Sequence, residues 1–214
     1  MTRIGVIGSG EVGKTLARGF KRHGFDVRIA TRTADKLAAF STETGIAVGG
    51  FADVAAWAES LVLAVKGSVA ADAVRQAGAA NVSGKVVMDT TNPIADLPPE
   101  DGVLRFFTTL DRSLMEDLQR EFPAAKFVKA FSTVGSALMV NPVFAGGGSS
   151  TLFICGNDAG AKAVVTGIIA KFGHGVADMG TAKAARAIEP LCMLWCIPGF
   201  LRNEWRHAFA LVRA

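Results

Sequence analysis

The chain has 214 residues, of which 50% are hydrophobic, and a formal net charge of +4 at pH 7; this length suits one domain, or one domain with a small addition. The basic residues are dispersed and are not interleaved with aromatic residues, which argues against nucleic-acid binding. Three cysteines predict no secreted disulfide framework. Since we expect neither a signal peptide nor an apolar run long enough to cross a bilayer, the sequence predicts a soluble cytoplasmic protein.

The first predicted strand, 3–8, runs directly into a turn with the glycine spacing G-x-G-x-x-G, and a helical pattern follows over 12–21. In such a strand–turn–helix unit Gly8 allows the tight turn and Gly10 lets the backbone approach a pyrophosphate. Gly13 lets the helix pack on the strand. Because the helix N-terminus offers unpaired N–H groups to phosphates, this segment predicts a dinucleotide site.

The end of the second predicted strand, 25–31, indicates which nicotinamide cofactor binds. NAD sites place an acid there, and its carboxylate accepts hydrogen bonds from the ribose hydroxyls. This chain instead has Thr31 and Arg32, with Lys36 one helical turn further on. A hydroxyl and two cations can bind a 2′-phosphate, which an acid would repel. The sequence therefore favours NADP(H), with these three side chains on its 2′-phosphate.

Strand-like and helical patterns continue to alternate after this point. Further strands are predicted at 46–48, 60–65, 85–91, 126–131, 151–156 and 175–180, and helices at 34–41, 51–58, 68–79, 112–121 and 158–171. The strands are continuous apolar runs, as in a parallel sheet covered on both faces. The sequence predicts an α/β fold with a Rossmann-like, doubly wound, mainly parallel sheet.

The last part of the chain has a different pattern. Residues 181–214 are apolar with a helical period, and Pro190 and Pro198 would kink or divide that helix. We therefore expect a dinucleotide-binding domain over 1–180 and a C-terminal helical extension over 181–214. This extension would cap the sheet or contact a second subunit, so we also expect a homodimer.

Other reactive residue types favour structural roles. The three cysteines, Cys155, Cys192 and Cys196, are interpreted as small buried hydrophobes, with no metal site. Asp89 would orient the loop after its strand. Arg186 and Glu189 would form a surface ion pair or, alternatively, lie near the cleft. His174 lies between glycines, as in a turn. Hydrolase chemistry is unsupported, because no histidine pairs in sequence with a serine or cysteine nucleophile.

Several segments resemble one enzyme family in the order in which they occur. They are GSGEVGKTLARGF (8–20), ATRTADK (30–36), VVMDTTNPI (86–94), FVKAFSTVG (127–135) and MGTAKAARAIEPL (179–191). The chain resembles the coenzyme F420-dependent NADP oxidoreductases and the related bacterial dinucleotide-binding enzymes, and it is similar to the cytoplasmic domain of the STEAP metalloreductases. It departs from the family at Ser132, often asparagine in relatives, and at Lys66, where many relatives carry proline.

This resemblance implies hydride transfer between NADP(H) and a second planar cofactor or substrate, either a flavin or coenzyme F420. Such a reaction needs two aligned rings and no acid, base or nucleophile, so we assign no catalytic side chain. The implied cofactor contacts are Gly8, Ser9, Gly10, Glu11, Val12 and Gly13 at the pyrophosphate, and Ala64, Val65, Lys66, Asn92 and Pro93 at the ribose and nicotinamide. The second ring would lie near Ser132, Thr133, Val134 and Ser136.

Two alternatives remain open from the residues. One is an imine or hydroxy-acid reductase of the pyrroline-carboxylate reductase or 6-phosphogluconate dehydrogenase type, which would have to complete its substrate site across a dimer. The other is a sensor that binds NADP(H) without turnover. The expected partner is a small planar redox acceptor, such as a flavin, F420, a quinone or a metal chelate, and not a nucleic acid or a membrane.

Overall fold

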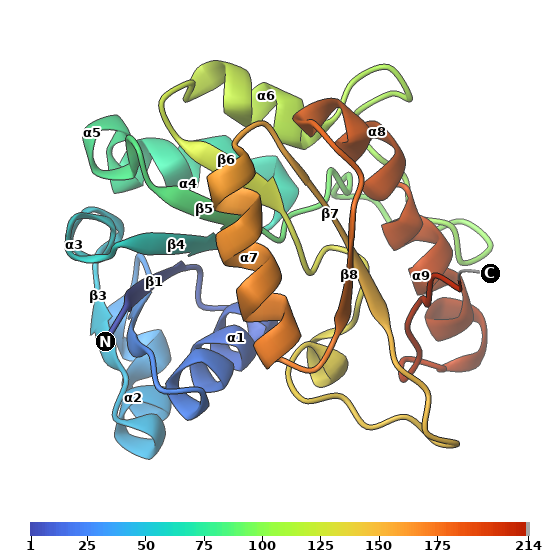
Figure 1. Cartoon of the computed structure of the whole chain (residues 1–214), viewed down its shortest axis with the longest axis horizontal. Coiled ribbons are helices and arrows are strands. Elements are labelled where there is room, and N and C mark those ends of the chain that lie inside the picture. The colour runs from blue at the N-terminus through green and yellow to red at the C-terminus, as the bar shows by residue number, and fades with distance from the viewer. Residues whose placement is uncertain (213–214) are drawn as a thin grey trace.

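The computed structural model describes residues 1–212, whose strands form an eight-stranded sheet in the order β3-β2-β1-β4-β5-β6-β7-β8 (Figure 1). Neighbouring strands are parallel except for β6 and β7, which pair antiparallel. The strands are β1 (Arg3–Ile7), β2 (Asp26–Ala30), β3 (Ala47–Gly49), β4 (Ser60–Leu63), β5 (Val86–Asp89), β6 (Lys126–Lys129), β7 (Thr151–Gly156) and β8 (Gly175–Asp178). The predicted α/β, mainly parallel, Rossmann-like fold is confirmed.

Helices cover both faces of this sheet, as a doubly wound fold requires. They are α1 (Glu11–Arg22), α2 (Ala38–Thr44), α3 (Phe51–Trp57), α4 (Ala70–Ala77), α5 (Ala79–Val82), α6 (Leu114–Glu121) and α7 (Ala159–Lys171), with 3₁₀ turns at Ala34–Leu37, Gly67–Val69, Ser136–Leu138 and Ala182–Ala184. One buried core joins α1, α2 and α7 to the sheet, and a second joins α3, α4 and α6. The predicted helix 68–79 ends early, because Gly78 has a φ of +92°.

The direction of winding reverses between β1 and β4. The chain runs outward from β1 through β2 to β3 and then returns to place β4 on the other side of β1. Ile7 pairs with both Ala30 and Leu63, so the carboxyl ends of these strands are level. In open α/β sheets, ligands bind at the carboxyl ends of the strands where the winding reverses. The fold therefore places Gly8, Thr31 and Ala64 at the expected binding edge.

The C-terminal part forms α8 (Ala185–Ile188) and α9 (Leu191–Arg202). Helix α8 contacts β7 and α6, and Figure 1 shows both helices on the side of the molecule that carries β7 and β8. Pro190 separates the two helices, whereas Pro198 lies inside α9. A small apolar core formed by Leu104, Cys192, Trp195 and Cys196 holds α9 against the 94–106 loop. The C-terminal helices are thus packed onto the α/β layer.

The segment Ala182–Arg202 has the length and apolar composition of a membrane-spanning helix, and about a third of its most apolar window is buried. The expectation that no segment reaches this threshold was therefore wrong. It rested on uninterrupted apolar runs, whereas here Arg186 and Glu189 lie within the segment. Length and composition alone are weak support for a membrane span, since helices packed on soluble domains pass the same test.

Candidate functional site

The glycine turn between β1 and α1 is shaped by two of its three glycines. Gly8 has a φ of +130°, and a Cβ there would collide with the carbonyl of Ala64. A Cβ on Gly13 would collide with the carbonyl of Gly8. These contacts explain why the turn and the approach of α1 to β1 require glycine.

Gly10 differs, because a Cβ added there would meet no atom within 4 Å. It is the N-cap of α1 and provides no side-chain hydrogen bond to the first N–H groups. Open space therefore lies in front of unpaired donors at the positive end of a 12-residue helix. This is the environment in which helices bind phosphate.

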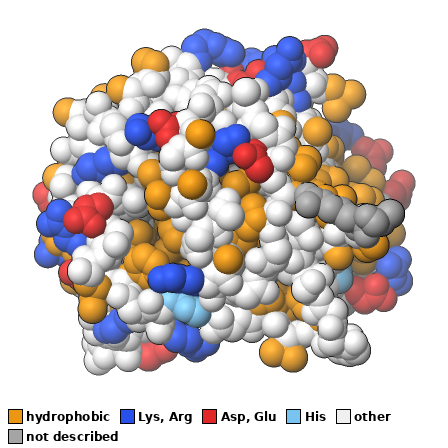
Figure 2. Space-filling view, viewed as in Figure 1, with side chains coloured by type: hydrophobic (Ala, Val, Ile, Leu, Met, Phe, Trp, Pro, Cys, Tyr) orange, Lys and Arg blue, Asp and Glu red, His pale blue; other side chains and the backbone are white. Residues whose placement is uncertain are grey.

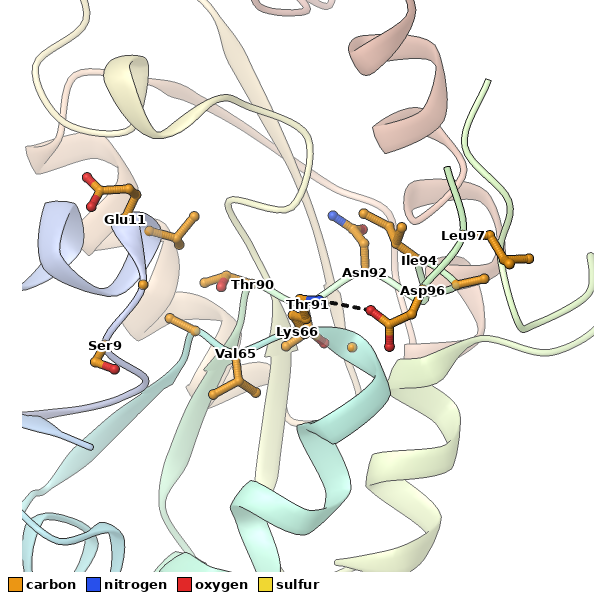
Figure 3. A pocket seen from close by; sticks show the side chains of 15 residues that line it. Ser9, Glu11, Val65, Lys66, Thr90, Thr91, Asn92, Ile94, Asp96 and Leu97 are labelled. Carbon is orange, nitrogen blue, oxygen red and sulfur yellow. Dashed lines mark hydrogen bonds and ion pairs between the residues drawn. The ribbon is translucent and has the colours of Figure 1, made fainter. Parts of the chain in front are cut away.

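A cleft of about 840 Å³ begins at this turn and crosses the carboxyl ends of β4 and β5 (Figure 3). It brings together eight predicted site residues: Ser9, Gly10, Glu11, Val12, Ala64, Val65, Lys66 and Asn92. It also contains residues that sequence reasoning missed: Gly67, Thr90, Thr91, Ile94, Ala95, Asp96 and Leu97. Of these, Thr90 and Thr91 could have been found, because they directly precede Asn92 at the end of a predicted strand.

The wall formed by residues 94–97 depends on contacts made within the folded chain. Ile94 forms a bridge with Phe106, and the Ala95 N–H donates to the carbonyl of Arg105 at 2.8 Å. The Phe107 N–H donates to the carbonyl of Pro93 at 2.9 Å. The predicted contact Pro93 is thus buried behind this wall and does not line the cleft.

The three residues predicted to hold a 2′-phosphate lie just beyond the end of β2. Thr31 is buried, and its hydroxyl is 3.2 Å from the backbone N–H and the carbonyl oxygen of Thr33. Arg32 and Lys36 are exposed, and within residues 1–212 no acidic side chain forms a salt bridge with either. Arg32 lines a separate hollow of about 80 Å³ that shares Val65 with the main cleft.

The residues predicted around a second ring are not brought into the cleft. Ser132, Thr133 and Val134 are buried, Ser136 is half-buried, and all four follow β6 outside the cleft lining. The link to the cleft is indirect, because Asn92 Nδ2 donates to the carbonyl of Ser132 at 2.8 Å.

An ion pair joins the two rims at the far end of the cleft (Figure 3). Lys66 Nζ lies 2.9 Å from Asp96 Oδ1, and Ser68 Oγ donates to Asp96 Oδ2 at 3.1 Å. These contacts lower the pKa of Asp96, with the hydrogen bond from Lys66 as the main cause. The carboxylate is therefore held by a cation and a hydroxyl from one short stretch of chain.

Comparison with known proteins decides the family. The family model for the NADP oxidoreductase coenzyme F420-dependent group matches residues 3–93. The whole chain aligns with the crystal structure of a candidate F420-dependent NADP-reductase from Arthrobacter sp. FB24, with a TM-score of 0.93, 35% identity and 100% of both chains covered. The chain belongs to the coenzyme F420-dependent NADP oxidoreductase family. As a member of it, the protein is an NADP-dependent oxidoreductase.

Two further relatives extend this comparison. The hypothetical protein SMa0349 from Sinorhizobium meliloti has a TM-score of 0.75 and 29% identity, with 88% of this chain and 90% of that chain covered. The metalloreductase STEAP3 of Rattus norvegicus is 28% identical over 205 residues. That match covers 93% of this chain but 39% of STEAP3, so the chain spans well under half of this curated relative.

Behind the cleft, this F420-dependent oxidoreductase family member has a fully buried group of charges. Lys129 Nζ lies 2.7 Å from Asp89 Oδ2 and 2.9 Å from Glu189 Oε1, and it donates to the carbonyl of Thr91 at 2.7 Å. The contact with the Thr91 carbonyl is a hydrogen bond, and the contacts with the two carboxylates are ion pairs. Burial alone would lower the pKa of Lys129, but the two carboxylates outweigh it and raise that pKa above its ordinary value.

The two carboxylates of this group also have backbone partners. Asp89 Oδ1 accepts hydrogen bonds from the N–H and hydroxyl of Thr91, at 2.9 and 2.6 Å. Glu189 accepts from the N–H groups of Leu114 and Met115 at the start of α6, each at 3.0 Å. Asp89 orients the loop after its strand, as predicted, and because Thr91 lines the cleft, the buried group fixes part of the cleft wall.

Glu189 therefore forms no surface ion pair with Arg186, and that prediction was wrong. Arg186 instead reaches Glu116 on α6, with two hydrogen bonds of 2.8 and 2.9 Å. The hydrogen bond from Arg186 is the main reason why the pKa of Glu116 falls to about 2. Spacing along one helix suggested the wrong pair, because each side chain has a better partner on a neighbouring element.

The remaining reactive side chains have structural environments. All three cysteines are buried and free, as predicted, and burial raises the pKa of Cys155 to about 12. His174 directly follows the turn at 172–173 and is buried: its Nδ1 lies 2.6 Å from Ser150 Oγ, and its Nε2 lies 3.1 Å from the carbonyl of Met139. Within residues 1–212 no cluster of possible metal ligands occurs.

Proposed function

We propose that this oxidoreductase transfers a hydride between NADP(H) and a flavin, deazaflavin or related planar acceptor that shares its cleft. The observation that carries this proposal is the continuity of the cleft, from the open space before Gly10 to the rim formed by Lys66 and Asp96. Its volume of about 840 Å³ lies in the upper part of the range for small-molecule sites. The end of the cleft at Gly10 suits the phosphates of the cofactor, and the end at Lys66 and Asp96 has room for the nicotinamide and acceptor rings.

The cleft supports a reaction that needs alignment of two rings. Its ionisable lining residues are Glu11, Lys66 and Asp96, and all three are exposed at its rims. The inner wall is formed by apolar residues such as Val12, Val65 and Ile94. NADP(H), when bound, would supply the hydride at nicotinamide C4, and a proton from solvent would complete reduction of the acceptor ring after the transfer. The protein contributes alignment and the exclusion of water.

For the cofactor, we propose that Thr31, Arg32 and Lys36 bind the 2′-phosphate of NADP(H) and so select it over NAD(H). Two exposed cations without acidic partners in residues 1–212 leave their donors free for a phosphate. The adenosine would lie over the end of β2, and the nicotinamide would extend past Val65 toward Asn92.

A steady-state assay tests the proposed reaction. The purified protein is mixed with NADPH and, in separate reactions, with a flavin, a deazaflavin, a quinone, a metal chelate or a cyclic imine, while the near-ultraviolet absorbance of NADPH is followed. Oxidation that depends on a flavin or deazaflavin supports the proposal. Turnover with the imine alone indicates the reductase alternative. Tight NADPH binding without oxidation by any acceptor indicates a sensor.

We also propose a cytoplasmic homodimer in which α9 forms part of the subunit contact. Leu194, Phe200 and Leu201 on α9 are 55%, 44% and 55% exposed, and Figure 2 shows hydrophobic side chains gathered on the side of the molecule that carries this helix. Burial of these side chains against a second copy would remove apolar surface from water.

A further inference from the structure

The rim of the cleft already holds one carboxylate in a two-donor arrangement. Lys66 Nζ contacts one oxygen of Asp96 at 2.9 Å, and Ser68 Oγ contacts the other at 3.1 Å. The two donors belong to a single short stretch at the end of β4, whereas the carboxylate comes from the separate 93–97 loop. Lys66 and Ser68 therefore form an anion-binding pair in which Asp96 occupies the place of an anion.

This pair lies at the end of the cleft that the proposed acceptor would occupy. Lys66 and Asp96 both line the cleft, at the end away from the glycine turn, and Figure 3 shows the bridge between its two walls. The pyrophosphate end is already supplied with donors by the first turn of α1. A second anion-binding pair at the other end of the cleft is thus available to the second ligand.

The ion pair between Lys66 and Asp96 is exposed enough for an incoming anion to replace Asp96. The side chain of Lys66 is 78% exposed and that of Asp96 is 62% exposed. Ion pairs at this level of exposure contribute little to stability, because water and salt screen them. An incoming anion with higher charge than one carboxylate can therefore compete for the same donors, while Asp96 and its loop move aside.

We propose that the acceptor carries an anionic group, which takes the place of Asp96 on Lys66 and Ser68, so that these residues select charged over neutral acceptors. This inference rests on the proposed function, since it assigns a substrate class to the same cleft. Lys66 attracts the anionic group of the acceptor, and Asp96 competes with that group for Lys66 and Ser68. The two residues consequently have opposite effects on an anionic acceptor and little effect on a neutral one.

Riboflavin and flavin mononucleotide provide the test, because they share one ring system and differ by a phosphate. Their binding to the NADP-loaded protein is measured by flavin fluorescence at low ionic strength. We expect flavin mononucleotide to bind about three- to tenfold more tightly than riboflavin. This preference should shrink as salt rises, since the Debye length falls from about 10 Å at 0.1 M to about 3 Å at 1 M.

Two variants then separate the roles of the rim residues. Lys66→Met should abolish the preference, whereas Asp96→Asn should tighten binding of flavin mononucleotide and leave riboflavin unchanged. A matched control is Lys126→Met, which removes an exposed lysine paired with Asp158 at 3.2 Å. Lys126 begins β6, at the amino ends of the parallel strands, whereas the cleft lies at the carboxyl ends of β4 and β5, so removal of this lysine should change the affinity for neither flavin.

Equal affinity for the two flavins, or no binding of either, overturns the anion-binding role. The role is also overturned if Lys66→Met and Asp96→Asn shift the affinity for flavin mononucleotide in the same direction, because the ion pair would then have a purely structural role. The hydride-transfer proposal is judged separately, by oxidation of NADPH in the same samples. If NADPH is oxidised but flavin mononucleotide binds no more tightly than riboflavin, the proposed function stands and the anion-binding role is overturned. If flavin mononucleotide binds more tightly but NADPH is not oxidised, the anion-binding role stands and the hydride-transfer proposal is overturned.

Discussion

Arg32 is the residue proposed to distinguish NADP(H) from NAD(H), by binding the 2′-phosphate. It is exposed just beyond β2, and no acidic side chain in residues 1–212 forms a salt bridge with it. Arg32→Ala should weaken NADPH binding by about 1.5–3 kcal/mol, through loss of a charge-assisted contact, and leave NADH almost unchanged. Calorimetric titration of both cofactors measures this, with Arg22→Ala on α1 as the control. Equal losses for both cofactors would place the 2′-phosphate elsewhere.

The glycines of the first turn should respond differently to substitution. Gly10→Val adds a side chain in open space, so the variant should fold normally but fail to bind NADP(H), because the side chain fills the proposed pyrophosphate position. Gly13→Val forces a collision with the Gly8 carbonyl and should destabilise the fold itself. Thermal unfolding and cofactor titration of both variants distinguish the effects. Retained NADPH affinity in Gly10→Val would show that the turn has no cofactor role.

Between elements, Lys129 joins β6 to β5, to the start of α6 and to α8 through Asp89, Thr91 and Glu189. Lys129→Met leaves two buried carboxylates without their cation, which should lower the free energy of unfolding by about 3–5 kcal/mol. Urea unfolding at pH 7 measures this. The raised pKa of Lys129 keeps its charge, and hence this stabilisation, in place at pH 7 and up to alkaline pH.

Lys126→Met is the control on the same strand, because the side chain of Lys126 is 43% exposed and its ion pair with Asp158 should contribute little to stability. A loss of stability in Lys129→Met no larger than in this control would mean that the buried group is replaceable by an apolar side chain.

The contact between α6 and α8 predicts a specific acid sensitivity. The pKa of Glu116 falls from the model-compound value of 4.5 to about 2 in the folded protein. Its contribution to stability is therefore complete above pH 4.5 and is lost as the pH falls toward 2. Glu116→Gln should be less stable at pH 7 and should lose less stability between pH 4.5 and 2. Acid titration followed by circular dichroism tests this, with Glu43→Gln as a surface control.

These contacts also show which features the sequence could predict. The glycine turn, the residues after β2 and the alternation of strands and helices depend on neighbours in the chain, so local patterns were sufficient. The Lys129 group and the Arg186–Glu116 pair join elements far apart in sequence. The 94–97 wall depends on pairing with Phe106, which no local pattern indicates. Most of the proposed phosphate end was therefore predictable, and the wall and anion-binding rim of the acceptor end were not.

For the whole molecule, the exposed apolar face of α9 predicts association. Leu194 is 55% exposed in the single chain, on a helix whose other side packs on the small core around Trp195. Multi-angle light scattering should give twice the 22.3 kDa of one chain. Leu194→Glu places a charge in the proposed contact and should yield a monomer that still binds NADPH. Val164→Glu, at a 47% exposed position on α7, should remain dimeric. A monomeric parent protein, or a dimer unaffected by Leu194→Glu, would mean that α9 faces something other than a second copy.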